Sequence, residues 1–235
     1  PKLKIISISL PPLQYYNDDN QLEGYFVEVI KAALATTELS YEMHLYPWAR
    51  SYYLAQHKEN VCIFSLNRIP EREHLFRWIT PLAQTHSAMY SLKSSNINIS
   101  TIEEAKAYAV AAIRNGVYHQ ILERNGFEEG KNMYVVSDSD SLVKMFLSKP
   151  EIELIFSDDI ILRKLAGKLG IDNNLFQKQF QLKHPPLEDY IACSPQTSKN
   201  ITTKLVNGFK AIKESGRINE INAKWRPQLG DSIID

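Results

Sequence analysis

The sequence predicts an α/β fold built from two parts. Short apolar runs of strand length alternate with longer amphipathic runs of helix length along the chain, and this alternation indicates βαβ units with parallel strands. The alternation occurs in both halves of the 235 residues, and each half has the size of a small domain. Residues 93–100, between the halves, are polar and lack periodicity, as expected of a connection.

The strands are expected where apolar or alternating runs stop at proline, glycine or polar turns. Their ranges are 4–10, 40–46, 61–64, 81–92 as an extended segment, 108–113, 132–136, 152–156, 179–183 and 190–194. Helical spacing of apolar residues, or a capping pattern, predicts the helices. Their ranges are 24–37, 49–57, 100–104, 117–124, 139–147, 160–169, 199–214 and 217–225.

The stretch 61–81 carries the main candidate site. A buried apolar strand runs into the small polar residues Ser65 and Asn67, and Pro70 then suits the first position of a short turn or helix. Polar groups at the carboxyl end of a strand are how open α/β sheets build ligand crevices. Arg72 follows in this turn, and its guanidinium can bind a carboxylate with two parallel hydrogen bonds. The alternative is a surface arginine in a charged turn.

Composition and charge exclude several classes of function. The formal net charge is +0 with 27 basic and 27 acidic residues, so nothing predicts a nucleic acid or an anionic membrane surface as partner. The longest apolar runs are far too short to cross a bilayer. No signal peptide opens the sequence, which fits a cytoplasmic protein or an exported one whose leader has been removed.

The two cysteines, Cys62 and Cys193, lie inside apolar strand-like runs. Free thiols packed as small hydrophobic groups are therefore expected rather than a disulfide. Neither cysteine has a close cysteine neighbour and the six histidines are scattered, so no metal site and no cofactor are expected.

Five segments, taken in order, carry a family resemblance. They are 8–28 with Gly24-Tyr25-Phe26-Val27-Glu28, the stretch 61–81, 108–116, 152–158 and 210–225. In this order and spacing they resemble the extracellular solute-binding proteins of the polar amino-acid type, family 3. The resemblance implies a type II periplasmic binding protein fold with two lobes joined by two hinge strands. Lobe one would hold 1–88 plus 188–235, lobe two would hold 89–187, and the ligand would lie in the cleft between them.

The resemblance also implies roles for particular residues. Arg72 matches the arginine that binds the ligand's α-carboxylate, and Asp158 matches the aspartate that receives its α-ammonium. One cation and one anion on opposite lobes would suit a zwitterion. Ser65 and Asn67 match hydrogen-bonding positions at the strand end.

Gly116, Val117 and Tyr118 match a helix start whose backbone N–H groups face the carboxylate. Val117 and Tyr118 depart from the family's hydroxyl residues, and Leu10 stands where many members carry an aromatic ring that stacks on the ligand.

Two further residues, Trp48 and Arg50, each allow two interpretations. Trp48 lies near a position that contacts the ligand's side chain, but core packing would explain it equally well. Arg50 would favour a second anionic group on the ligand if it points inward, whereas the alternative is a solvated helix face.

The implied function is capture of a small polar metabolite, an amino acid or related carboxylate, by hinge closure in the periplasm. The protein would act as a monomer and deliver its ligand to an ABC permease. One alternative is a sensor that acts through a separate receptor or kinase. A second is a dehydratase-like enzyme, for which Glu28, Asp158 and His86 are the candidate acid–base residues, although none lies in a motif. No catalytic activity is expected.

Overall fold

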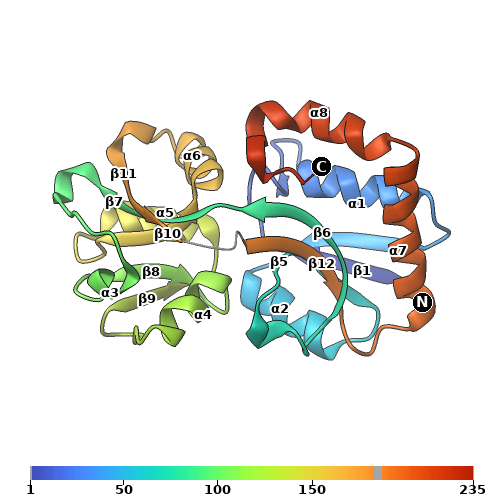
Figure 1. Ribbon diagram of the computed structural model, residues 1–235, viewed down its shortest axis with the longest axis horizontal. Helices are drawn as coiled ribbons and strands as arrows, with labels where there is room; N and C mark the ends of the chain where they lie inside the picture. The colour runs from blue at the N-terminus through green and yellow to red at the C-terminus, as the bar shows by residue number, and fades with distance from the viewer. Residues whose placement is uncertain (1, 183–186, 235) are drawn as a thin grey trace. The chain divides into compact units, whose positions relative to one another are not determined.

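The computed structural model describes residues 2–182 and 187–234. The expected strand end at Lys183 and the segment His184-Pro185-Pro186 lie outside them. The chain divides into two compact units (Figure 1). Unit 1 consists of Pro1–Thr85 and Leu187–Asp235, and unit 2 of His86–Pro186. The sequence predicts that the chain passes from one part to the other after residues 88 and 187. The two compact units divide after residues 85 and 186.

Unit 1 contains a five-stranded mixed sheet in the order β4-β1-β5-β12-β6. Its strands are β1 (Leu3–Ser7), β4 (Tyr41–Leu45), β5 (Val61–Asn67), β6 (Arg77–Thr85) and β12 (Leu187–Cys193). The first three strands in this order are parallel, and β12 runs antiparallel to both β5 and β6. A small hairpin, β2 (Tyr15–Tyr16) and β3 (Leu22–Glu23), precedes the first helix.

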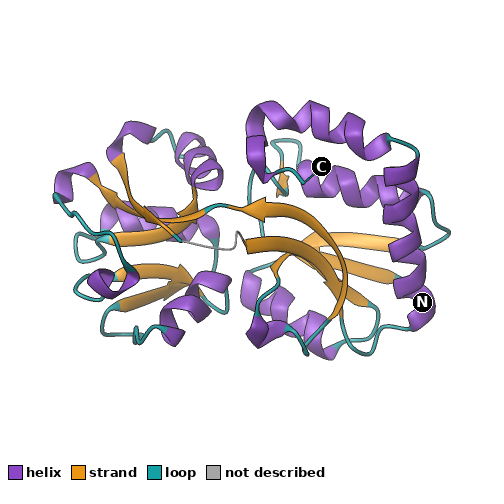
Figure 2. Ribbon diagram, in the orientation of Figure 1, coloured by secondary structure: helices purple, strands orange, loops and turns teal. Residues whose placement is uncertain are grey.

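Helices cover both faces of this sheet (Figures 1 and 2). On one side α1, α7 and α8 pack together, and on the other α2 packs on β1 and β5. Their bounds are α1 (Tyr25–Ala35), α2 (Trp48–His57), α7 (Lys199–Glu214) and α8 (Arg217–Leu229), with the 3-10 turns η1 (Pro70–Arg72) and η4 (Gly230–Ser232). The glycine between α7 and α8, Gly216, has φ of 78°, as a helix C-terminus requires.

Unit 2 contains a second five-stranded sheet in the order β11-β7-β10-β8-β9. Its strands are β7 (Ser87–Leu92), β8 (Val110–Ile113), β9 (Met133–Val136), β10 (Leu154–Asp158) and β11 (Phe176–Gln181). Its helices are α3 (Ile102–Ala105), α4 (Val117–Arg124), α5 (Ser139–Ser148) and α6 (Asp159–Lys168), with the 3-10 turns η2 (Lys93–Ser95) and η3 (Asn173–Leu175). Two apolar clusters fill this unit, one including α5 and α6 residues and the other including α3 and α4 residues.

The predicted α/β fold with two parts is confirmed. Neither sheet, however, is purely parallel. In unit 1, β12 lies between β5 and β6 and runs against both. In unit 2, β7 runs antiparallel to β10 and β11. The βαβ pattern of the sequence describes only consecutive segments, so it did not reveal strands that return from far along the chain. In the described ranges no helix has the length and apolar character needed to span a bilayer.

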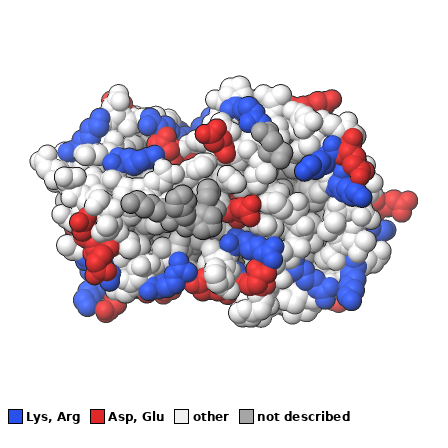
Figure 3. All heavy atoms as spheres, in the orientation of Figure 1, with Lys and Arg blue, Asp and Glu red and all other residues white. Residues whose placement is uncertain are grey.

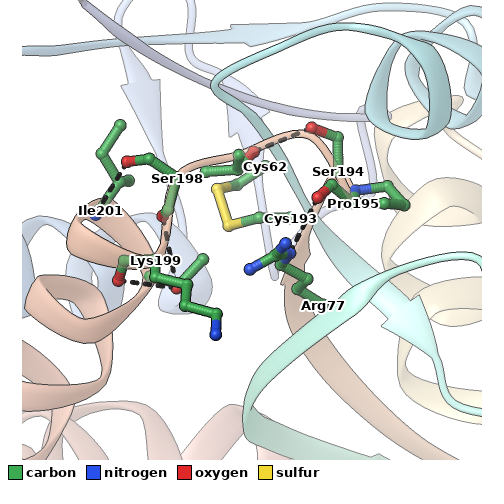
Figure 4. The surroundings of a disulfide bond; sticks show 10 residues. Cys62, Arg77, Cys193, Ser194, Pro195, Ser198, Lys199 and Ile201 are labelled. Carbon is green, nitrogen blue, oxygen red and sulfur yellow. Dashed lines mark hydrogen bonds between the residues drawn. A yellow bond between two sulfur atoms is a disulfide. The ribbon is translucent and has the colours of Figure 1, made fainter.

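The prediction of two free thiols is wrong, because Cys62 and Cys193 form a disulfide (Figure 4). The two residues are direct partners in the β5–β12 pairing, and their Cα atoms lie 3.8 Å apart. Both side chains are fully buried. The sequence separation of 131 residues hid this proximity, since the pairing of distant strands is not a local property.

Removing the disulfide should destabilise unit 1. The crosslink ties the two chain segments of unit 1 together across the whole of unit 2, and losing such a bond costs about 2–5 kcal/mol. We expect the double variant C62A/C193A to unfold at a lower urea concentration than the oxidised wild type. Reductant present during unfolding should lower the wild-type midpoint and leave the variant's midpoint unchanged. Equal midpoints for the variant and the oxidised wild type would contradict this role.

Candidate functional site

The carboxyl end of β5 is the centre of the polar groups in unit 1. All seven residues of β5 are buried, because β1 and β12 flank its two edges and helices cover both faces of the sheet. Ser65 and Asn67 are its last polar residues, and η1 follows with Pro70 at its first position. We call the five residues gathered here the β5-end cluster: Ser65, Asn67, Arg72, Thr85 and Asp189.

Arg72 is fully buried, with 0% of its surface exposed. Its Nη1 donates a hydrogen bond to the backbone oxygen of Asn67 at 3.1 Å. The guanidinium carbon lies 5.1 Å from the ring centre of Tyr52 and 5.9 Å from that of Trp48, both on α2. Burial lowers the pKa of Arg72 to about 10, so the group stays charged at neutral pH. A desolvated cation of this kind favours an anionic partner.

Three side chains of the β5-end cluster form a closed hydrogen-bond network. Asn67 Nδ2 donates to Asp189 Oδ1 at 3.0 Å, and Thr85 Oγ1 donates to Asp189 Oδ2 at 2.6 Å. Thr85 is the last residue of β6, and Asp189 lies in β12 opposite Asn67 in the strand register. The sequence did not single out Thr85 and Asp189. The available signal was the acidic pair Glu188-Asp189 directly before the apolar end of β12.

Ser65 combines an unusual backbone with an unsatisfied hydroxyl. Its φ of 59° lies in the left-handed region, which a residue with a Cβ rarely adopts. The residue is 8% exposed, and its Oγ has no hydrogen-bond partner among the described residues. Such strain persists only where the surrounding structure imposes it, and it concentrates at functional sites. The Ser65 hydroxyl thus combines burial, a strained backbone and an unused hydrogen-bonding capacity among the described residues.

The remaining predicted residues of unit 1 lie in different surroundings. Trp48 is buried and stacks on Tyr52, so it packs in the core while lying near Arg72. Arg50 is exposed, with its guanidinium 4.1 Å from the ring centre of Tyr46, which matches the solvated helix face rather than an inward position. Leu10 is partly buried and forms an isolated β-bridge with Gln14.

In unit 2 the main predicted residue, Asp158, ends β10 and begins α6. It is 5% exposed. Its Oδ1 accepts from the backbone N–H groups of Ile160 at 2.8 Å and Ile161 at 3.4 Å, and its Oδ2 accepts from the backbone N–H of His86 at 3.0 Å. Burial raises the pKa of the Asp158 carboxyl, and these N–H groups oppose that effect only in part. The carboxylate thus both caps the helix and retains a desolvation cost that a cation would offset.

The start of α4 lies at the same sheet edge as Asp158. Strands β8 and β10 are parallel neighbours, so their carboxyl ends meet at one edge. Gly116 begins α4 without a side-chain hydrogen bond to the helix, and a Cβ there would approach the backbone oxygen of Ile113 to 2.9 Å. An uncapped helix start of this kind favours anions. Val117 is buried and apolar, so its side chain contributes little to the surface at this edge.

Tyr118 fastens this helix to the sheet. Its ring stacks on Phe156 at 5.3 Å, and its hydroxyl shares a hydrogen bond with Ser87 Oγ at 2.9 Å.

Glu28, one of the three acid–base candidates, has a structural role. Glu28 on α1 accepts hydrogen bonds from Lys224 and Trp225 on α8 at 2.9 and 2.8 Å. Although burial opposes them, these contacts hold the pKa of Glu28 below its usual range. This carboxylate joins two packed helices. The described residues include no group of three or more metal-binding side chains.

Each of the two α/β units carries a buried charged group near the carboxyl end of a strand, and the two groups have opposite signs. The sequence matches the bacterial extracellular solute-binding proteins, family 3, over residues 4–228. The chain belongs to this family. Comparison with curated protein sequences finds no significant match.

Many solved structures share the fold, at low sequence identity. A histidine kinase sensor domain with similarity to periplasmic binding proteins matches with TM-score 0.86 and 14% identity, covering 99% of this chain and 98% of that one. An ABC uptake transporter substrate-binding protein from Streptococcus pneumoniae with bound histidine matches with TM-score 0.82 and 12% identity, covering 100% and 95%. An ancestral arginine-binding protein bound to arginine matches with TM-score 0.81 and 14% identity, covering 95% and 97%.

The strained backbone at Ser65 should make the stability of the protein sensitive to glycine at this position. Substituting Gly relieves the left-handed conformation, whereas substituting Ala removes the same hydroxyl and keeps the strain. We expect S65G to be more stable than S65A by about 1 kcal/mol in urea unfolding. Both variants should bind ligand more weakly than the wild type, because both lack the hydroxyl. If S65A proves as stable as S65G, the backbone at this position is not strained.

Proposed function

We propose that the protein is a periplasmic receptor that captures a small polar metabolite, an amino acid or a related carboxylate, and delivers it as a monomer to an ABC permease. The observation that carries this proposal is the pair Arg72 and Asp158. Each is buried near the carboxyl end of a strand, one in each unit, and burial shifts the pKa of each against its charged form. A ligand with a carboxylate and an ammonium group would place an opposite charge beside each of them.

Simultaneous contact with both units would couple binding to movement. The chain passes from one unit to the other twice, once after Thr85 and once before Leu187, and these are the two hinge segments. A ligand held by Arg72 and Asp158 together stabilises the arrangement in which both can reach it. The domain division expected from the sequence, with the ligand between the parts, is included in this proposal.

The surface chemistry and the disulfide fit an extracytoplasmic solute-binding role. Basic and acidic side chains alternate over the face drawn in Figure 3, in keeping with the net charge of +0, and this mixture favours neither nucleic acid nor an anionic surface. The Cys62–Cys193 disulfide is characteristic of oxidising compartments such as the periplasm. The family consists of extracellular binding proteins, so we propose no catalytic activity.

A sensory role is the second candidate. One structure with the same fold is a histidine kinase sensor domain, and its match covers 99% of this chain. The ligand site proposed here would serve either role, because both need closure around a ligand. Co-purification of the ligand-loaded protein with a permease complex supports transport, and ligand-dependent stimulation of a kinase supports sensing.

A thermal-shift screen of amino acids, dicarboxylates and amines tests the proposal, because a ligand that binds only the native state raises the melting temperature. For the compound with the largest shift, we expect R72M and D158N each to lose about 2–5 kcal/mol of binding free energy in calorimetry.

The matched controls are R68M and D159N. Arg68 pairs with Glu73 and Asp159 with Arg163, both at the surface, so these variants should bind like the wild type. Full affinity in both R72M and D158N, with intact folding by circular dichroism, would overturn the site.

The raised pKa of Asp158 predicts the pH dependence of binding. A bound ammonium group stabilises the ionised carboxylate, so binding lowers this pKa. Affinity should be constant above the pKa that Asp158 has in the ligand-free protein. Below this pKa it should fall by up to about tenfold per pH unit. In D158N this dependence should disappear. A wild-type affinity that is flat down to pH 4 would contradict pairing between Asp158 and a cation.

A further inference from the structure

The Asn67 amide of the β5-end cluster is held in one orientation by a buried carboxylate. Asp189 is 5% exposed, and its Oδ1 lies 3.0 Å from Asn67 Nδ2. An ionised carboxylate can only accept hydrogen bonds, so the amide must turn its NH2 group toward it. The flipped amide would place two acceptors against each other in a buried site, which is costly. Asp189 thus determines that the NH2 group of Asn67 points toward the carboxylate and that the amide oxygen points away from it.

Thr85 reinforces this orientation. Its hydroxyl proton goes to Asp189 Oδ2 at 2.6 Å, so its oxygen remains an acceptor toward Asn67 Nδ2 at 3.4 Å. Both neighbours of the NH2 group are therefore acceptors. The amide oxygen, Oδ1, receives no hydrogen bond from the described residues. Asn67 consequently offers an acceptor and no donor to a ligand.

Strand packing alone gives no reason for an acid at this position. Asp189 lies inside β12, between β5 and β6, in register with Asn67 on one side and Ala83 on the other. An apolar residue would fill such a position without the desolvation cost of a buried carboxylate. The charge also acts on Arg72: burial lowers the Arg72 pKa, and Asp189 is one of the groups that oppose this. The acid therefore orients the Asn67 amide and favours the charged form of Arg72.

We propose that Asp189 is a positioning residue that sets the ligand specificity of unit 1. By holding the NH2 group of Asn67, it makes the β5-end cluster present an acceptor beside the Arg72 donor. The cluster then selects a ligand that carries a primary amine next to its carboxylate over the same acid without the amine. This inference rests on the proposed function and names the ligand group that Asn67 recognises.

The test compares matched ligand pairs that differ only in the amine. The probes are L-arginine with 5-guanidinopentanoate, L-glutamine with glutaramate, and L-histidine with imidazolepropionate, measured by calorimetry. In D189N the Asn67 amide can turn over. We expect the amine-bearing member of a bound pair to weaken about tenfold and its amine-free partner to change less than twofold.

The matched control is E188Q, which removes the same charge from the adjacent residue of β12, on the opposite side of the strand. It should change neither member of a pair. Equal weakening of both members in D189N, or no change in either, would overturn the specificity role. A purely structural role for Asp189 would affect the two members alike.

A second measurement needs no ligand. In the free, 15N-labelled protein, the Asn67 side-chain NH2 signal, identified by its absence in N67S, should exchange with solvent at least about tenfold faster in D189N than in the wild type or E188Q. Unchanged exchange would overturn the positioning step. If the wild type binds no compound of the thermal-shift screen while this exchange difference is present, the proposed function fails and the positioning step stands.

Discussion

Strand β12 returns to unit 1 after the whole of unit 2 and inserts between β5 and β6. This pairing completes the sheet of unit 1, and the Cys62–Cys193 disulfide fastens it. The same register places Asp189 beside Asn67. The β5-end cluster therefore depends on an interaction between segments more than a hundred residues apart in the chain.

The two units share one physical design. In each, a buried strand delivers polar groups at its carboxyl end, and a helical turn follows directly. In unit 1 the turn η1 carries Arg72, and in unit 2 Asp158 caps the N-terminus of α6. Burial penalises the charged form of both groups. Each unit thus stores an electrostatic cost, and in the proposed function a ligand of complementary charge would relieve it.

Local patterns predicted much of the fold and part of the site. Arg72, Ser65 and Asn67 could be singled out because they lie in one short stretch with a strand before it and a proline within it. The disulfide and the antiparallel strands could not, because periodicity says nothing about which distant strands pair. Thr85 and Asp189 were missed for the same reason. Arg50 could have pointed either way on its helix, and its exposure together with its position over the Tyr46 ring distinguishes the two interpretations.

The central claim is that one ligand satisfies buried charges from both units. A crystal structure of the protein with the compound that gives the largest thermal shift tests it most directly. The account predicts one bound molecule whose anionic group accepts hydrogen bonds from the Arg72 guanidinium and whose cationic group donates to the Asp158 carboxylate. A molecule bound elsewhere, or one that touches only one of these two side chains, would contradict it.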